Sequence, residues 1–336
     1  MIRKIVLLGV TLQLVVAGAL QAQDDFHLSQ FDVATMYINP ALTGMYEGQN
    51  GDYRMYNDDR SQWGAIGKPF STIYLAYDMP FRKWNRNFGF GAYLIDNAAP
   101  AGYLNTFNFM LSGAYNILHN TNHKHYLTTG LQMGFFYKSF DPNSFTYDNQ
   151  YSVAEGGFDQ NLPNEETFGK TSVINFDANY GLFYKYIDTS KRFNPFAGFT
   201  LQHVTEPNES FTAIQSRMPI QYVIDAGCDI KVSEQLKLSP EFLYMNAAGA
   251  TELTGGIIGY YKIEHSNYEP ILGLGFRDQD AVIIQTGIKV GQDAFRISYD
   301  ANTSYLSAFT QGRGAWELSL IITGIHGQPL FPKSMF

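Results

Sequence analysis

The sequence has little cysteine, little charge and few basic residues, and each shortage excludes a class of protein. One cysteine in 336 residues cannot support a disulfide framework. Charged residues make up 16%, against roughly 25% in typical globular domains, so a salt-bridged soluble helical protein is not expected. Because 31 acidic residues outnumber 23 basic ones, no nucleic-acid partner is expected.

Long hydrophobic runs are also missing after residue 22. No later window offers about 18 consecutive apolar residues, the length that marks a transmembrane helix. If the chain spans a membrane, it therefore does so as a β-barrel.

Residues 1–22 have the three parts of a secretory signal peptide. Arg3 and Lys4 precede an apolar stretch at 5–20, and small residues up to Ala22 follow it. An uncleaved membrane anchor is the alternative, but no basic stop-transfer cluster comes after the apolar stretch. We expect cleavage after Ala22 and a mature chain outside the cytoplasm.

Aromatic residues are abundant, at 15%, and apolar residues alternate with polar ones over long segments. In segment 217–231, for example, Ile224 belongs to an apolar face and Asp225 to a polar one. This period of two indicates strands with one apolar and one polar face. Fourteen segments have the pattern: 48–57, 69–79, 87–96, 104–118, 125–138, 172–187, 193–204, 217–231, 235–245, 250–263, 267–277, 280–291, 293–302 and 315–325.

These segments predict an all-β fold, a transmembrane antiparallel β-barrel of about 14 strands. Most are 10 to 16 residues long. Strands of soluble proteins average about 5 to 6 residues, whereas tilted membrane strands need about 9 to 11.

The connections between the segments support the same fold. Short turns such as 291–293 alternate with longer connections such as 139–171. In outer-membrane barrels the short turns are periplasmic and the longer loops external. We therefore expect the acidic loop 139–171 to be external, where it binds a partner or is a disordered loop without a role.

The rest of the chain is arranged around a single barrel domain, 48–325. Residues 23–47 are too polar and broken to span a membrane, so we expect them to form a plug in the barrel or a periplasmic segment. Within them, Asn39 and Pro40 are candidate partner-binding residues; the alternative is a rigid turn, since proline restricts the residue before it. Residues 326–336 are expected to be a C-terminal tail.

Charged residues gather on the polar faces of the segments, which line the lumen of a barrel. We expect a structural charge network in a filled lumen; a polar conduit or docking cavity is the alternative. The residues are Lys185, Asp225, Asp229, Lys231, Glu241, Arg296, Asp300 and Glu317. Cys228 falls on the apolar face and is expected to be a lipid-facing residue without a redox role.

Six short phrases follow one another along the chain. They are Phe26-His27-Leu28-Ser29-Gln30-Phe31, Tyr37-Ile38-Asn39-Pro40-Ala41 with Gly44, Arg60-Ser61-Gln62-Trp63-Gly64, Gly275-Phe276-Arg277 with Asp280-Ala281, Ser298-Tyr299-Asp300, and Trp316-Glu317-Leu318-Ser319-Leu320. In this order they resemble the PorP/SprF family of the type IX secretion system.

The resemblance implies an integral outer-membrane β-barrel without catalytic activity or cofactor. It implies a role in the export or surface attachment of large secreted proteins with a type IX C-terminal signal domain, such as gliding adhesins. The implied partners are these cargo proteins, other type IX components and outer-membrane lipids. A porin or hydrophobic-solute channel, similar to the fatty-acid transporters, is the first alternative, and a barrel lipase is the second.

Arg60, Gln62 and Trp63 are further candidate partner-binding residues, because the pattern places them in the first external loop, 57–68. Trp and Arg side chains dominate many protein interfaces. In the alternative interpretation, Trp63 belongs to an aromatic girdle and Arg60 contacts lipid headgroups.

A cluster of His119, His123 and His125 could ligate zinc or copper. It contains no Cys, Asp or Glu and has Lys124 in its midst, so we assign no metal site.

Two Ser–His pairs could belong to a barrel lipase, but neither has the spacing of a nucleophile elbow. They are His203 with Ser210, and His265 with Ser266. We assign no catalytic residue and no cofactor.

Overall fold

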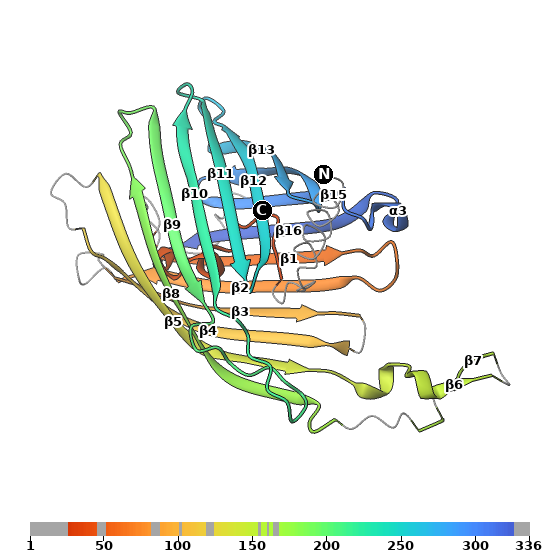
Figure 1. The fold of residues 1–336 in the computed structure, drawn as a ribbon. Coiled ribbons are helices and arrows are strands. Elements are labelled where there is room, and N and C mark those ends of the chain that lie inside the picture. The colour runs from red at the N-terminus through yellow and green to blue at the C-terminus, as the bar shows by residue number, and fades with distance from the viewer. Residues whose placement is uncertain are drawn as a thin grey trace, which may run out of the picture.

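The chain forms a closed barrel of antiparallel strands (Figure 1). The computed structural model describes residues 26–45, 52–81, 88–100, 103–118, 124–153, 156–159, 161–163 and 168–325. The barrel strands are β1 (Tyr53–Gln62), β2 (Phe70–Pro80), β3 (Phe88–Ala98), β4 (Asn105–Asn116), β5 (His125–Ser139), β8 (Ser172–Tyr186), β9 (Phe193–Gln202), β10 (Gln221–Lys231), β11 (Leu236–Ala247), β12 (Ala250–Tyr261), β13 (Tyr268–Arg277), β14 (Ala281–Val290), β15 (Asp293–Asn302) and β16 (Arg313–Gly324). Each pairs with its neighbours in sequence, and β1 closes the barrel on β16. The predicted 14-stranded barrel is confirmed.

The first strand differs from its prediction. The pattern predicts a strand at 48–57, whereas β1 spans Tyr53–Gln62, so the predicted loop 57–68 shrinks to 63–69. In the half of β1 that ends at Gln62, the outward-facing polar residues Asn57, Asp59 and Ser61 alternate with buried Asp58 and Arg60. Both faces are polar there, and the alternation that identifies the other strands is lost.

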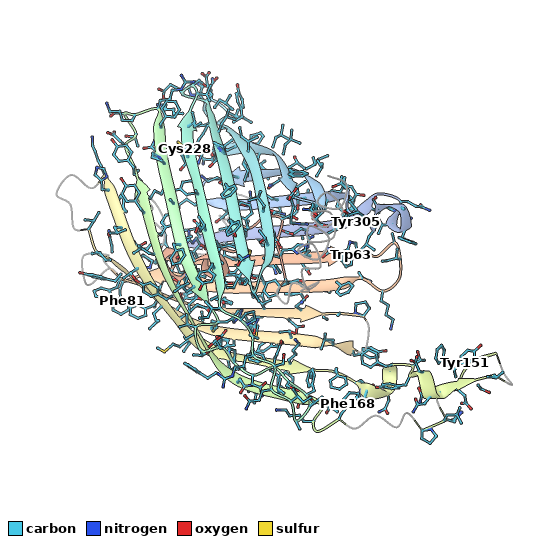
Figure 2. The ribbon with its side chains drawn as sticks, viewed as in Figure 1. Trp63, Phe81, Tyr151, Phe168, Cys228 and Tyr305 are labelled. Carbon is cyan, nitrogen blue, oxygen red and sulfur yellow. The ribbon has the colours of Figure 1, made fainter. Side chains whose placement is uncertain are left out.

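The barrel wall has an apolar outer face and a polar inner face. In β10, Ile224 is 42% exposed and Asp225 only 6% exposed, as the alternation predicts. Cys228 continues the outer row and is partly exposed (Figure 2). Exposed apolar side chains recur around the outer face, among them Leu111, Leu131, Ile174, Phe176, Leu272, Leu274 and Ile284. Such a face suits the hydrocarbon of a bilayer.

Residues 26–45 lie inside the barrel, and we call them the plug. They contain α2 (Thr35–Ile38) and the 3-10 helix η1 (Pro40–Leu42). Met36 and Ile38 are buried in one apolar cluster with wall residues such as Tyr74 and Val223. The plug is therefore packed against the inner face as part of the hydrophobic core.

No helix in the described ranges is long and apolar enough to cross a membrane.

The connection between β5 and β8 projects from the barrel (Figure 1). It contains the 3-10 helices η4 (Pro142–Ser144) and η5 (Asp148–Gln150), and the short hairpin β6 (Tyr151–Ser152) and β7 (Gly157–Phe158). At its base the ring of Phe140 lies 4.5 Å from that of Phe211 and 5.1 Å from that of Phe168, between centroids. The described residues of this acidic loop thus fold on an aromatic base.

The two rims of the barrel differ in their connections. We call the rim with the β5–β8 connection the loop rim; its other connections are 63–69, 99–104, 203–220, 248–249, 278–280 and 303–312. The opposite rim, the turn rim, has 81–87, 117–124, 187–192, 232–235, 262–267 and 291–292. The longest connections all lie on the loop rim, which is why we expect that rim to be external.

Candidate functional site

Five polar residues from the plug and four strands meet inside the barrel, and we call them the clasp: Ser29, Arg60, Arg277, Asp300 and Glu317. Arg60 on β1 lies 2.8 Å from Asp300 on β15 and 2.9 Å from Glu317 on β16. Arg277 on β13 lies 2.7 Å from Asp300. The Ser29 hydroxyl donates to Asp300 at 2.8 Å and accepts from Arg60 at 2.8 Å and Arg277 at 3.2 Å. One plug hydroxyl thus joins three strands.

Glu317 also holds the backbone of the plug. Its carboxylate accepts hydrogen bonds from the backbone N–H of Ser29 at 2.8 Å and of Gln30 at 2.6 Å. The Gln30 side chain donates to Ser298 at 3.3 Å and accepts from the Ser319 hydroxyl at 2.6 Å. The Ser29-Gln30 dipeptide is therefore bonded through both its backbone and its side chains.

The clasp is buried, since none of its four charged side chains is more than 2% exposed. Buried charges are costly unless they are paired and hydrogen-bonded, and here each one is. Removing one partner from such a network costs about 3 to 5 kcal/mol. The main effect of the clasp is therefore to fix the position of the plug. Its net contribution to the free energy of unfolding is small by comparison.

His27 lies beside the clasp. Its Nδ1 is 3.6 Å from Glu252, and its Nε2 is 3.8 Å from Asp280. Burial, followed by the positive charges of Arg277 and Arg60, holds the pKa of His27 well below its usual range. This imidazole is therefore neutral at pH 7.

A second contact fixes the middle of the plug. The Asn39 side chain donates to the backbone carbonyl of Leu182 at 3.1 Å and to Asp225 at 3.3 Å. Its oxygen accepts from the backbone N–H of Ala41 at 3.0 Å, which caps η1. Proline at the first position of η1 suits it, because that N–H has no helical partner.

Glycines in the wall make room for the plug. A Cβ at Gly130 would overlap the backbone of Pro40, and one at Gly181 would overlap the Asn39 side chain. At Gly89 it would overlap the Thr43 carbonyl. We call Gly89, Gly130 and Gly181 the glycine seat, because close backbone approach requires glycine there.

The six phrases that carry the family resemblance converge on these contacts. Five of them supply one clasp residue each, and the Asn39-Pro40 phrase lies on the glycine seat. The alternation places Asp300 and Glu317 on the lumen face. It does not show that Ser29 reaches them, because the plug has no strand register from which to place it.

Three candidate partner-binding residues are buried inside the barrel. Arg60 is not in an external loop as predicted, because β1 extends through it and its side chain is 2% exposed inside the barrel. Asn39 and Pro40 are buried in the lumen. Partner binding by these residues stays a prediction, and each contacts the chain's own residues here.

Gln62 and Trp63 reach the loop rim. Gln62 is the last residue of β1, and Trp63 has a positive φ of 57° where the chain leaves the strand (Figure 2). The Trp63 ring meets the edge of Phe70 at a centroid distance of 5.4 Å. Trp63 thereby starts the connection to β2 with a fixed aromatic contact.

Trp63 lines an open groove of about 890 Å³ on the loop rim. The groove is bounded by residues 63–70, by Pro100 and Tyr103, and by segment 141–146. Ile66 is 50% exposed and Tyr103 60% exposed. The Lys68 ammonium lies 5.3 Å from the centroid of the Tyr103 ring. Aromatic and charged groups together suit a protein surface better than a small apolar solute.

The lumen beside the clasp is filled. The cavity between the plug residues Ser29 and Asp32 and the wall residue Glu241 has a volume of about 10 Å³. Asp32 forms a further ion pair with Arg296 at 2.7 Å. The charge network expected on the lumen face therefore packs against the plug at this level.

The two Ser–His pairs form no triad. His203 pairs with Asp177, with Nδ1 and Oδ2 2.6 Å apart, whereas the Ser210 hydroxyl lies 3.1 Å from that of Thr212. In the other pair, the Ser266 hydroxyl accepts from the backbone of Tyr268. Sequence reasoning missed the Asp177–His203 pair, although β8 and β9 are adjacent in the predicted barrel.

The histidine cluster is only partly described. His125 Nδ1 lies 2.8 Å from the Tyr184 hydroxyl, while His119 and His123 fall outside the described residues. Within the described ranges, no group of three His, Cys, Asp or Glu residues could hold a metal ion.

Comparison with known proteins gives one family and several barrels of similar fold. The family model for the type IX secretion system membrane protein PorP/SprF matches residues 20–322. No curated protein matches the chain. The CymD monoaromatic hydrocarbon channel is 11% identical with a TM-score of 0.52, covering 88% of this chain and 94% of its own. A Pseudomonas aeruginosa FadL homologue is 11% identical with a TM-score of 0.42, covering 86% and 93%. At this identity the likeness concerns the fold alone.

Proposed function

Since the chain belongs to the PorP/SprF family of type IX secretion system membrane proteins and forms an outer-membrane β-barrel, we propose that it assists the export or surface attachment of large secreted proteins. The proposed cargo carries a type IX C-terminal signal domain, and gliding adhesins are one class of it. The barrel acts without catalysis, as a receiving or anchoring component beside other parts of the secretion system.

The clasped plug is the observation that carries this proposal. Residues 26–45 occupy the lumen. Ser29 and Gln30 hydrogen-bond to buried residues of β1, β13, β15 and β16, and Asp32 forms an ion pair with Arg296 on β15. A cargo chain cannot pass through a lumen that is held closed in this way. The working surface is therefore outside the lumen, on the loop rim and on the outer wall.

The groove at Trp63 is the surface on which we place the contact with cargo or translocon. Gln62 and Trp63 keep their proposed role as partner-binding residues there, because both lie at the loop rim. Asn39, Pro40 and Arg60 serve this function indirectly, since they hold the plug.

Gene deletion with complementation tests the proposal. Without the barrel, a large surface protein should remain inside the cell or be degraded, and uptake of small solutes should not change. Trp63→Ala should reproduce part of the display defect, whereas Phe199→Ala, at an outward position of β9, serves as the control. Full surface display by a normal amount of the Trp63→Ala barrel would remove the groove from the contact surface.

A channel for hydrophobic solutes is the second candidate function, because the fold is compatible with it. The filled lumen beside the clasp argues against it. Loss of uptake of one solute class on deletion, with normal display of surface proteins, would favour the channel.

A further inference from the structure

Among the described residues, the outer face of the barrel carries charged side chains away from the strand ends in one region. Away from the strand ends, outward-facing positions of the described strands β4 to β16 hold apolar, aromatic, small or uncharged residues. On β1, β2 and β3, the outward-facing positions nearer the loop rim include polar and charged residues. We call these residues the polar stripe: Asn57, Asp59, Ser61, Ser71 and Asp96.

Strand register makes the polar stripe continuous. Asp59 on β1 is opposite Ile73 on β2, and Ile73 is opposite Asp96 on β3. Ser61 is likewise opposite Ser71. Two carboxylates therefore stand on one face with a single strand between them.

The stripe lies close to the external boundary of the membrane. Asp59 precedes the end of β1 at Gln62 by three residues, roughly 10 Å along the strand. A charged side chain on the lipid face is unfavourable, by an amount that depends on its depth. In the described part of the chain no basic residue forms an ion pair with Asp59 or Asp96. The Asp96 carboxylate accepts a hydrogen bond from the Asn105 side-chain amide at 2.8 Å.

The polar stripe continues into the external groove. The groove is lined by residues of the connection between β1 and β2, among them Trp63 and Lys68, and by Pro100 and Tyr103 from the connection between β3 and β4. The connections of these three strands, together with segment 141–146 of the β5–β8 connection, thus line a groove above the polar stripe. Together they form one face that runs from the membrane to the exterior.

We propose that this face docks laterally against a different outer-membrane protein, whose contact surface presents Lys or Arg near the external membrane boundary. The argument is charge complementarity, because the face offers carboxylates that no basic residue of the described ranges neutralises. Anionic headgroups of the outer leaflet do not fit, since carboxylates repel phosphate. A second copy does not fit either, because a two-fold interface would set the same carboxylates against each other.

Photo-crosslinking in intact cells tests the proposal. A photoreactive residue replaces Ser61 in the polar stripe, or Thr286 at an outward position of β14 as the matched control. We expect Ser61 to give an adduct with one other outer-membrane protein, through a region that contains Lys or Arg, and Thr286 not to give it.

Charge substitutions show whether the carboxylates carry the contact. Asp59→Lys should lower the adduct yield about tenfold, because like charges then face each other. Asp278→Lys, an exposed acidic position in the β13–β14 connection, should leave the yield unchanged. If Asp59→Lys fails to assemble, Asp59→Asn with Asp96→Asn should still lower the yield.

Several results would overturn the proposal. They are an adduct with lipopolysaccharide or with a second copy, identical adducts at both positions, no adduct at Ser61, or an adduct that survives the charge substitutions. Because display of the surface protein is measured separately, normal display with no adduct would leave the proposed function standing.

Discussion

The two faces of β1 carry charges in opposite surroundings. On the inner face, Arg60 meets Asp300 and Glu317 within 2.9 Å and is almost fully buried. On the outer face, the preceding residue, Asp59, is exposed beside apolar Ile73 and Leu318. Charges that the chain neutralises itself hold its own structure together. A carboxylate without an ion pair among the described residues, on a lipid-facing wall, is the basis for the proposed contact with a second protein.

Breaking the inner network should have the largest effect. Arg60→Ala leaves Asp300 and Glu317 without one of their buried partners, at a cost of about 3 to 5 kcal/mol. We expect the plug to loosen and the barrel to lose heat-modifiable migration on gels. Arg313→Ala, at an exposed position on the loop rim, is the control. Equal stability of the two variants would mean that the clasp does not hold the plug.

A charge placed on the apolar part of the outer face should have the next largest effect. Ile224→Arg puts a cation against lipid, which costs about 2 to 4 kcal/mol near the middle of the bilayer. Asp225→Asn, on the lumen side of the same strand, keeps a polar group near Asn39 and should cost much less. The amount of assembled barrel in the outer membrane measures both. Equal tolerance would contradict the register of β10.

Removing the charge of Asp59 from the outer face should stabilise the barrel, whereas the two changes above should destabilise it. Asp59→Leu takes a carboxylate off the lipid-facing wall, and we expect it to raise the stability of the isolated barrel by up to about 1 kcal/mol. Thermal unfolding of the purified barrel in lipid bilayers measures the change. A clear loss of stability would show that Asp59 has a structural role within the chain.

A pH effect from His27, beside the clasp, should be the smallest. Folding keeps His27 neutral by lowering its pKa, whereas the unfolded chain binds a proton below about pH 6.5. Stability from this group is therefore complete above that pH and declines as the pH falls below it. His27→Gln should reduce the acid sensitivity in a thermal unfolding series from pH 7.5 to 5. An unchanged pH profile would show that His27 titrates alike in both states.

The sequence predicts the barrel well because the alternation of apolar and polar residues directly indicates which side chains face the lipid and which face the lumen. It fails at β1, where Asn57, Asp59 and Ser61 make the outer face polar and the strand resembles a loop. That failure and the polar stripe have the same cause. The pattern also places Asp300 and Glu317 on the lumen face, but their joining through Ser29 depends on a plug without periodicity.

Conductance across a planar bilayer tests most directly whether the plug closes this barrel. The purified wild-type barrel should show no stable open steps, because hydrogen bonds from Ser29 and Gln30 to the clasp, and the glycine seat, hold residues 26–45 in the lumen. The Arg60→Ala variant lacks the side chain that links β1 to Asp300 and Glu317, and it should show intermittent openings. Stable open steps from the wild-type protein would contradict a closed lumen and favour the channel.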